Sequence, residues 1–594
     1  MRELEYPFSE DILKKKKRLR RMLLECEGVN YDDKNIAILG GSTTDDIRAV
    51  LELFLLNYGI RPKFYESEYN QYYEDAMFPN AELEAFAPDV IIFFTSNRNI
   101  PVYPTVADSA ESVEEKLQAV YGRFAQMWDH VAETYHCTVI QNNFELPFYR
   151  LLGNKDASDI HGRVNFISRL NQMFYEYAQR HENFYIHDIH YESASYGLEK
   201  WSDPFYWHMY KYALCVPAIP YTAFGLANII KSCYGKNKKA LVLDMDNTLW
   251  GGVIGDDGAD HIEIGQETSL GQTYSEFQAY LKAQKDLGVL LAVASKNEHE
   301  TAMTGLKRPD SVLREEDFAS IRANWNPKDV NILEIAQELT LLPESFVFVD
   351  DNPAEREIVR KQIPGIAVPE MEEVEHYIQT IDRNGYFEVT NLSADDVKRN
   401  DMYQANAMRM KAQAAFADYT EYLKSLEMKG TIRRFEPMYL SRIAQLTNKS
   451  NQFNLTTKRY SLAEIEEAAE DPDRITLYGK LEDKFGDNGV VSVVIGRVEG
   501  DTLHIELWLM SCRVLKRDME YAMMDELAAQ CEKRGIRTIL GYYYPTAKNA
   551  MVKDFYGKQG FEKAEEDEEG NALWRFALTP AYQKKNTVIN VEEA

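Results

Sequence analysis

The stretch Lys-Lys-Ala-Leu-Val-Leu-Asp-Met-Asp-Asn-Thr-Leu-Trp-Gly-Gly, residues 238–252, decides the fold of the middle of this chain. Its apolar run, residues 240–243, predicts a buried strand that ends in Asp244 and Asp246. Since side chains alternate along an extended chain, both carboxylates point in roughly the same direction, with Met245 facing away. Two carboxylates on one rim suit a hard cation such as Mg²⁺, and a carboxylate can attack a phosphorus atom.

Three later segments supply the other groups that such chemistry needs. Residues 289–297 predict a second apolar strand that ends in Ser295, whose hydroxyl could donate to a phosphate oxygen. Asn297, two residues further on, is a candidate substrate-binding residue. Residues 325–329 bring Lys328, a compact cation suited to neutralising phosphate charge. Residues 346–357 predict a third strand that ends in Asp350 and Asp351. The four elements are what a phosphoaspartate mechanism requires, with Asp244 as nucleophile and Asp246 as acid and base.

In the type and order of these elements the sequence resembles the haloacid dehalogenase (HAD) superfamily of phosphatases and phosphotransferases. The resemblance implies a Rossmann-like domain and a Mg²⁺ cofactor, held by Asp244, the backbone carbonyl of Asp246, and Asp350, with Asp351 in support. The sequence between Asp246 and Ser295 leaves no room for a large inserted cap domain. The pocket is therefore expected to be closed by neighbouring domains, or left open for a protein-bound group.

Composition indicates a large soluble protein of several domains. The chain has 594 residues, 45% of them hydrophobic, and no apolar run long enough to span a membrane. Its formal net charge of −28 argues against nucleic acid as a general partner. The six cysteines lack paired spacing and the N-terminal residues lack an apolar signal region, so we expect a cytoplasmic protein with reduced thiols.

The pattern of predicted elements indicates an α/β multidomain protein. The domains that we expect are a parallel-sheet α/β domain with an N-terminal helix (1–235), the HAD-like domain (236–385), a helical connector (386–430), a mixed α+β domain (431–580) and a loose tail (581–594).

The first unit carries a possible site of its own. Ser42 follows a predicted strand and a Gly-Gly turn, near a helix N-terminus where backbone amides can hold an oxyanion. Asn70 and Asn97 could serve the same pocket, and the layout resembles an SGNH-type hydrolase. Such enzymes need a late Asp-x-x-His to activate the serine. Here Asp203 is followed three residues later by Tyr206 instead, and His208 has the wrong spacing, so binding or docking is favoured over hydrolysis.

The C-terminal unit resembles the closing half of a GNAT acyltransferase fold, on the evidence of residues 545–550 and 554–561. A strand, a basic turn and a helix start over residues 503–520 could present Arg513 and Arg517 to a phosphate group. The stretch 513–518 contains no glycine, whereas ordinary GNAT enzymes bind coenzyme A with a glycine-rich loop. Ordinary acetyl-CoA use is therefore not expected.

Over nearly its whole length the chain resembles the FkbH-like proteins, a branch of HAD subfamily IIIC. The blocks that carry this resemblance are Leu-Asp-Met-Asp-Asn-Thr-Leu-Trp-Gly-Gly-Val, Asn-Gln-Phe-Asn-Leu-Thr-Thr and Ser-Cys-Arg-Val. It implies that 1,3-bisphosphoglycerate is dephosphorylated and its glyceryl group loaded onto the phosphopantetheine thiol of an acyl carrier protein. Cys512, beside Arg513, is the candidate acyl acceptor, because positive surroundings lower a thiol pKa. The alternative is that Cys512 has no chemical role and only packs at the end of a strand.

Four further polar residues could orient the glyceryl or pantetheine group, or could equally be structural: Asn451, Asn454, His504 and Asn549. Two functions of different class remain open. One is the glyceryl transferase and phosphatase. The other is a Mg²⁺-dependent phosphatase that acts on a sugar phosphate or phosphoprotein. In that case the flanking domains of this chain are only binding modules. A degenerate scaffold is disfavoured because every phosphatase position is intact.

Overall fold

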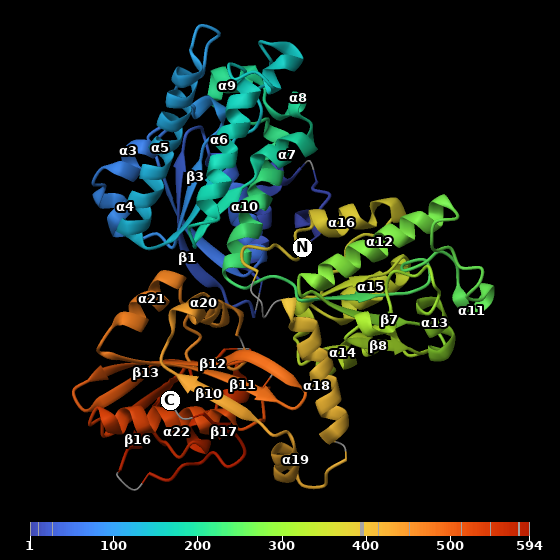
Figure 1. Ribbon diagram of the computed structural model, residues 1–594, viewed down its shortest axis with the longest axis vertical. Coiled ribbons are helices and arrows are strands. Elements are labelled where there is room, and N and C mark those ends of the chain that lie inside the picture. The colour runs from blue at the N-terminus through green and yellow to red at the C-terminus, as the bar shows by residue number, and fades with distance from the viewer. Residues whose placement is uncertain are drawn as a thin grey trace. The chain divides into compact units, whose positions relative to one another are not determined.

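A computed structural model describes the chain as two compact units (Figure 1). The first comprises residues 1–233 with 461–464, and the second residues 234–460 with 465–594. The described residues are 2–9, 11–26, 28–392, 397–413, 415–450, 452–511, 514–546, 548–579 and 582–592, without the side chains of 404, 407, 410 and 411. Three sheets form the frame, which confirms the predicted α/β multidomain class.

The first unit is built on a five-stranded parallel sheet with the order β2-β1-β3-β4-β5. Its strands are β1 (Asp32–Gly40), β2 (Ile60–Glu66), β3 (Val90–Phe94), β4 (Thr138–Asn142) and β5 (Phe184–His187). Strands β3 and β4 are buried along their whole length, as expected for a parallel sheet covered on both faces. The direction of strand addition reverses between β1 and β3, and such a switch point is where open α/β sheets bind ligands.

Helices cover both faces of this sheet (Figure 1). On one face, the core joins α5 and α6 to side chains of β1, β3 and β4, and centres on Phe124, Trp128 and Phe174. Elsewhere Phe54 of α2 and Phe224 of α10 lie 4.9 Å apart between ring centroids. The helices are α1 (Ile12–Leu24), α2 (Asp45–Asn57), α3 (Tyr72–Met77), α4 (Ala81–Phe86), α5 (Ala110–Tyr135), α6 (Arg163–Ala178), α7 (Ile189–Tyr196), α8 (Leu198–Trp201), α9 (Pro204–Tyr210) and α10 (Ile219–Cys233).

A buried carboxyl group lies near the carboxyl end of this sheet. Glu145, three residues after β4, is only 3% exposed, and its Oε2 accepts a hydrogen bond from the backbone N–H of Asn97 at 3.2 Å. Burial raises the pKa of Glu145 to about 7, although backbone hydrogen bonds and Arg98 act in the opposite direction. The charged form is therefore disfavoured in the folded protein.

Glu145→Gln is expected to remove a pH dependence of stability. Because the folded pKa lies above the unfolded value, the parent protein loses stability as pH rises from about 4.5 to about 7, by about 3 kcal/mol. The variant should match the parent near pH 4, below the unfolded pKa, and exceed it at pH 8, as measured by the calorimetric unfolding temperature of the full chain. A difference that does not change with pH would contradict the assignment.

The HAD-like part of the second unit has a four-stranded parallel sheet with the order β8-β7-β6-β9. Its strands are β6 (Ala240–Leu243), β7 (Leu290–Ser295), β8 (Ser320–Ala323) and β9 (Phe346–Val349). Its helices are α11 (Ile254–Asp257), α12 (Ser269–Asp286), α13 (His299–Leu306), α14 (Lys328–Glu338), α15 (Pro353–Gln362) and α16 (Tyr377–Arg383). Only α11 and α12 lie between β6 and β7, so the connection contains no large cap.

Helices α18 (Arg399–Gln413) and α19 (Tyr419–Ser425) precede the C-terminal sheet. This sheet has the order β15-β16-β14-β13-β12-β11-β10-β17. It is antiparallel except where β13 pairs with β14 and where β10 pairs with β17. Its strands are β10 (Lys429–Arg433), β11 (Arg474–Asp483), β12 (Gly486–Glu499), β13 (Thr502–Met510), β14 (Thr538–Tyr543), β15 (Glu562–Glu566), β16 (Ala572–Ala577) and β17 (Asn590–Val591).

Four helices accompany the sheet: α20 (Leu440–Lys449), α21 (Leu462–Glu470), α22 (Met519–Lys533) and α23 (Phe555–Lys558). The helix α22 connects the parallel pair β13 and β14, as a crossover of parallel strands requires. Its buried side chains join those of β11, β12 and β13 in one core. The mixed sheet with this crossover gives the C-terminal part the predicted α+β, GNAT-like architecture.

The residues predicted as a loose tail are ordered where the structure describes them. Strand β17 adds to the edge strand β10, and Asp525 of α22 accepts hydrogen bonds from Tyr582 and from the backbone N–H groups of Lys585 and Asn586. The sequence did not reveal this because a two-residue strand has no periodicity of its own.

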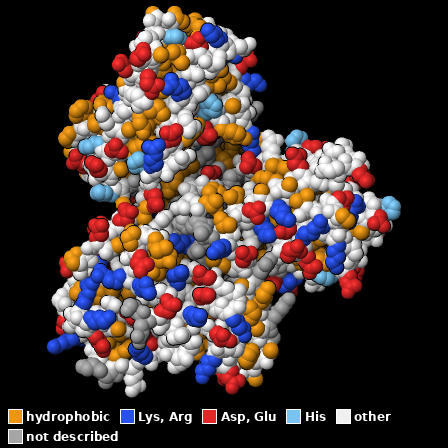
Figure 2. Space-filling view, viewed as in Figure 1, with side chains coloured by type: hydrophobic (Ala, Val, Ile, Leu, Met, Phe, Trp, Pro, Cys, Tyr) orange, Lys and Arg blue, Asp and Glu red, His pale blue; other side chains and the backbone are white. Residues whose placement is uncertain are grey.

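No helix in the described part of the chain is long and apolar enough to cross a membrane. On the face drawn in Figure 2, acidic side chains lie among basic ones on every part of the chain.

Candidate active site

The register of the HAD-like sheet brings the predicted strand-end groups together. Leu243 is paired with Val349 on one side and with Val293 on the other. The residues that follow, Asp244 after β6 and Asp350 after β9, are therefore neighbours at the carboxyl edge of the sheet. The chain adds β7 and β8 on one side of β6 and β9 on the other, so this edge is again a switch point.

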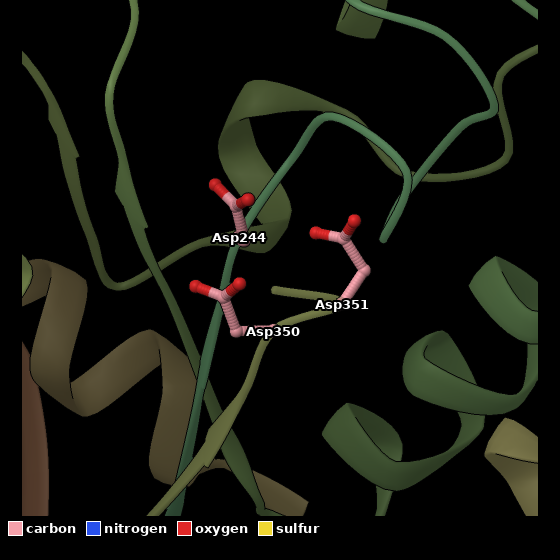
Figure 3. Close-up of side chains that lie close together, drawn as sticks. All are labelled: Asp244, Asp350 and Asp351. Atoms are coloured by element: carbon pink, nitrogen blue, oxygen red, sulfur yellow. The ribbon is translucent and has the colours of Figure 1, made fainter. Parts of the chain in front are cut away.

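Three carboxylates converge at this edge. Asp244, Asp350 and Asp351 each offer a ligand oxygen, and these oxygens all lie within 4.8 Å of one another (Figure 3). Asp244 is 7% exposed, and its Oδ1 is buried without a hydrogen-bond partner. An orphaned buried carboxylate oxygen among further carboxylates is the donor set that a hard divalent cation satisfies. The residues present therefore fit Mg²⁺.

Lys328 supplies the positive charge within this cluster. Its side chain is 4% exposed, and its Nζ lies 3.0 Å from Asp244 Oδ2 and 2.5 Å from Asp350 Oδ2. Burial is the largest single influence and acts to lower the pKa of Lys328, but the attraction of the two carboxylates outweighs it and raises that pKa. The lysine therefore stays charged in the site.

Burial and mutual repulsion disfavour the charged forms of the carboxylates in this site. Burial, with repulsion from Asp244, raises the pKa of Asp350 to about 6 against the opposing effect of Lys328. The same two causes raise the pKa of Asp351. One lysine thus offsets only part of the negative charge, and a bound divalent cation would relieve the remaining repulsion.

Asp246 is oriented by three donors. Its Oδ1 accepts from Trp250 Nε1 at 2.9 Å and from the backbone N–H of Ile254 at 3.1 Å, and its Oδ2 accepts from Asn297 Nδ2 at 2.9 Å. The amide of Asn297 also donates to Ser295 Oγ at 3.3 Å. Asn297, predicted to bind substrate, therefore contacts the proposed acid and base, while Ser295 lies at the end of β7 as predicted.

Sequence reasoning missed several residues that support this site. Trp250 lies in the first motif, where its residue type predicted no role, and its indole N–H donates to Asp246. Thr248 Oγ1 accepts from the backbone N–H of Asp351 at 3.3 Å. The four-residue spacing from Asp246 to Trp250 was the available signal, because it allows a side chain to return to the strand end within one turn.

Ser42 lies at the switch point of the first unit, and its side chain is buried. Ser42 is 3% exposed, and its Oγ is buried without a hydrogen-bond partner. Asn70 Oδ1 accepts from Asn99 Nδ2 at 3.2 Å, and the same amide donates to the carbonyl of Gly41 at 3.0 Å. A Cβ at Gly41 would lie 2.4 Å from Asn99 Nδ2, so a larger residue there would displace the Asn99 amide.

Asn99 is therefore an amide beside the Ser42 turn. Asn97 Nδ2 donates to the carbonyls of Glu145 and Leu146. Asn99 was missed, although its spacing from Ser96 is that of a capping box, which the structure forms.

No base is hydrogen-bonded to Ser42 Oγ among the described residues. The Asp203 side chain instead caps α9 by accepting from the backbone N–H of Phe205, and His208 is exposed. The turn after Ser42 is held through Thr43, whose N–H donates to the carbonyl of Lys211 and whose hydroxyl donates to that of Tyr210.

Three candidate residues of the C-terminal unit, Asn451, Cys512 and Arg513, lie outside the described residues. The neighbouring segment is well defined. Leu455 N–H donates to the carbonyl of Trp508, Met510 N–H to that of Phe453, and Tyr544 N–H to that of Leu455. Since β13 pairs with β14 only over residues 502–505 and 538–541, residues 453–455 bridge the two strands where they diverge.

Asn454 and Asn549 secure this bridge. Asn549 is fully buried, and its Nδ2 donates to the carbonyls of Asn454 and Tyr544, each at 2.9 Å. Its Oδ1 accepts from the backbone N–H of Thr546. The Asn549 amide is thus committed to backbone groups. Asn454 keeps a buried Nδ2 without a hydrogen-bond partner, while its Oδ1 accepts from the N–H of Thr457.

The two remaining predicted residues, His504 and Arg517, contact other side chains of the protein. His504 Nδ1 is 2.8 Å from Tyr542 Oη, and six residues, about 20 Å of strand, separate His504 from the end of β13 at Met510. Arg517 is 7% exposed, and its guanidinium contacts Asp483 at 3.2 Å and Asn406 at 2.6 Å. These contacts hold the guanidinium in the protein interior.

Comparison with known proteins places this geometry in a class. Residues 35–231 match the family model described as FkbH, N-terminal domain. The N-terminal part of the Bacteroides fragilis protein BF1531, containing a phosphatase domain and crystallised with Mg, is similar to 63% of this chain over 99% of its own length, with 29% identity and a TM-score of 0.58. No curated protein matches the chain.

Two acetyltransferase structures resemble a smaller part of the chain. The Escherichia coli ribosomal-protein-S18-alanine N-acetyltransferase shares 16% identity over 27% of this chain and 99% of its own, with a TM-score of 0.21. The paia N-acetyltransferase from Thermoplasma acidophilum shares 16% over 25% of this chain and 99% of its own, with a TM-score of 0.19.

The parallel sheet with a strand-end aspartate, a buried lysine and an acidic pair defines a phosphatase domain of the HAD type. With the match of residues 35–231 to the FkbH N-terminal domain, the chain is similar to the FkbH-like proteins of the HAD superfamily.

Proposed function

We propose that this protein is a Mg²⁺-dependent phosphatase and glyceryl transferase that uses 1,3-bisphosphoglycerate and loads an acyl carrier protein. The observation that supports the phosphatase step is the buried cluster of Asp244, Lys328, Asp350 and Asp351 at an edge without a cap. The likeness to a phosphatase domain crystallised with Mg supports the metal. The glyceryl group, the donor and the carrier rest on the resemblance to FkbH-like proteins.

In the phosphatase step, a carboxylate oxygen of Asp244 attacks the phosphorus of the phosphate ester, and the bond from phosphorus to the substrate oxygen breaks. Asp246, aligned by Trp250 and Asn297, gives a proton to the leaving oxygen. Asp246 then takes a proton from the water that hydrolyses the phosphoaspartate. Lys328 neutralises phosphate charge, and Mg²⁺ bound by Asp244 and Asp350 supplies electrostatic stabilisation when present.

In the transfer step, the Cys512 thiolate attacks the carbonyl carbon of the acyl phosphate. A carbon–sulfur bond forms, the carbon–oxygen bond to phosphate breaks, and inorganic phosphate leaves. The pantetheine thiol of the carrier then attacks the thioester, takes the acyl group and returns the cysteine to its free form. No oxidant or further co-reactant is needed.

Intact-protein mass spectrometry tests the proposal after the protein is mixed with Mg²⁺ and enzymatically generated 1,3-bisphosphoglycerate. We expect a hydroxylamine-labile glyceryl adduct that is absent in Cys512→Ala and retained in Cys531→Ala, a variant at a buried cysteine of α22. Phosphate release without any adduct, lost only in Asp244→Asn, would overturn the transferase part.

That second outcome corresponds to the alternative function, a phosphatase for a sugar phosphate or phosphoprotein with flanking binding domains. Its support is the absence of a large cap between β6 and β7, which leaves the site open to a bulky or protein-bound phosphate. The binding geometry around Ser42, which lacks a hydrogen-bonded base, agrees with either function.

A further inference from the structure

Arg356 lies directly behind the acidic pair of the phosphatase site. It is the fourth residue of α15, is 5% exposed, and turns back toward the strand end from which the helix starts. Its Nη1 donates to the backbone carbonyl of Asp350 at 2.8 Å and to that of Asp351 at 2.7 Å. One guanidinium nitrogen therefore holds two consecutive peptide groups, those that carry two of the three converging carboxylates.

The other side of the guanidinium is anchored outside the loop. Nη2 of Arg356 contacts Glu370 Oε2 at 3.2 Å, and Glu370 Oε1 contacts Arg360 Nη2 at 2.8 Å. Arg360 Nη2 also donates to the carbonyl of Val368 at 2.9 Å, and Ala367 is bridged to Val347 of β9. Thus the loop is tied through Arg356 and Glu370 to a segment that is itself fixed to the sheet.

The carboxylate positions depend on this backbone. Asp350 and Asp351 are adjacent residues whose side chains must both reach the position facing Asp244, a geometry that repulsion between the carboxylates opposes. Among the described residues, Arg356 donates no hydrogen bond to the carboxylate oxygens of Asp350 or Asp351. It acts on the carbonyls, and so on the direction in which each side chain leaves the main chain.

We propose that Arg356, braced by Glu370, is a positioning residue that preorganises Asp350 and Asp351 for Mg²⁺. The inference rests on the proposed Mg²⁺ site and goes further by naming the groups that set its affinity. Outer groups of this kind typically contribute 10–100-fold to metal affinity. A lysine cannot replace this arginine, since a single nitrogen cannot hold both carbonyls and Glu370 in the same planar geometry.

The chain contains a matched control pair. Arg308 donates through Nη1 to two carbonyls, those of Ala259 and Ile262, at 2.9 and 3.0 Å, and its guanidinium pairs with Asp310 at 2.6 Å. It therefore repeats the arrangement of Arg356 and Glu370 in the same part of the fold, but its carbonyls carry none of the site carboxylates.

Isothermal titration of the metal-free full chain with MgCl2 tests the inference. We expect Arg356→Lys to raise the Mg²⁺ dissociation constant about 10–100-fold, and Glu370→Ala to raise it several-fold, about 3–10-fold, because the arginine loses its brace. Arg308→Lys and Asp310→Ala should leave it within about 2-fold of the parent. Phosphate release by Arg356→Lys should recover toward the parental rate at saturating Mg²⁺ and fall at limiting Mg²⁺.

The outcomes separate this inference from the proposed function. If the parent does not bind Mg²⁺, the proposed phosphatase site is wrong. If the parent binds Mg²⁺ and both Arg356→Lys and Glu370→Ala bind it equally well, the positioning role is wrong. Should Arg356→Lys not fold, by circular dichroism, Glu370→Ala decides alone, since its side chain is 47% exposed and tolerates truncation.

Discussion

Asp244→Asn is expected to abolish Mg²⁺-dependent phosphate release, with a loss of about 10⁴-fold or more. The amide is a poor nucleophile and a weak metal ligand, and Asp244 is the residue that faces both Lys328 and the acidic pair. The measurement is release of inorganic phosphate from the phosphate ester at saturating Mg²⁺, because the transfer step at Cys512 releases the acyl phosphate group without Asp244. Folding should be preserved, because removing one of three neighbouring negative charges relieves repulsion.

Asp286→Asn is the matched control for this variant. Asp286 is exposed and ends α12, which leads into the amino end of β7, the opposite edge of the sheet from the site. We expect parental activity from it. If Asp244→Asn retained activity within about 10-fold of the parent while Asp286→Asn was also active, Asp244 would not be the nucleophile.

Lys328→Met is expected to destabilise the metal-free protein by about 3–5 kcal/mol, the usual cost of removing one partner from a buried ion pair. The lysine is 4% exposed and lies within 3.0 Å of two carboxylates that would be left without it. Calorimetric unfolding of the full chain without Mg²⁺ measures the effect. Added Mg²⁺ should restore part of the lost stability, because the cation replaces the missing positive charge.

The same variant should lose phosphate release by about 10²–10³-fold, since one preorganised charge that faces the transferred group is gone. Lys361→Met is the control: its side chain is 71% exposed and its ion pair with Glu357 lies on the surface, so we expect a change below about 1 kcal/mol. A stability loss in Lys328→Met no greater than that of Lys361→Met would contradict the buried position of Lys328.

Much of the phosphatase site could be predicted from local sequence. Its carboxylates and Ser295 lie at or just after the ends of short apolar strands, and parallel strands bring their carboxyl ends to one edge of a sheet. Lys328 instead begins the helix α14. The pairing of Leu243 with Val349 and Val293 then places Asp244 beside Asp350 and near Ser295. The closeness of these residues follows from where each strand ends in the sequence, because parallel strands end at the same edge of a sheet.

The direction of individual side chains depended on the tertiary structure. Asn297 donates to Asp246, Asn99 donates to the carbonyl of Gly41 beside Ser42, and Asn549 donates to backbone carbonyls. An amide has donors and acceptors for several roles, so its residue type leaves its partner open. Only the packing of distant segments selects among these partners.

For this protein, the sequence alone therefore determined the class of fold, and the order along the chain of the carboxylates, the hydroxyl and the lysine that a hard cation and a phosphate group require. The tertiary structure decided which polar residues reach the site and which support it, as with Trp250 and Arg356. It also decided that residues 453–455 bridge β13 and β14, and that residues 582–592 join the C-terminal core. The physical reason is that strand ends follow from local apolar patterns, whereas side-chain hydrogen bonds join residues far apart in the chain.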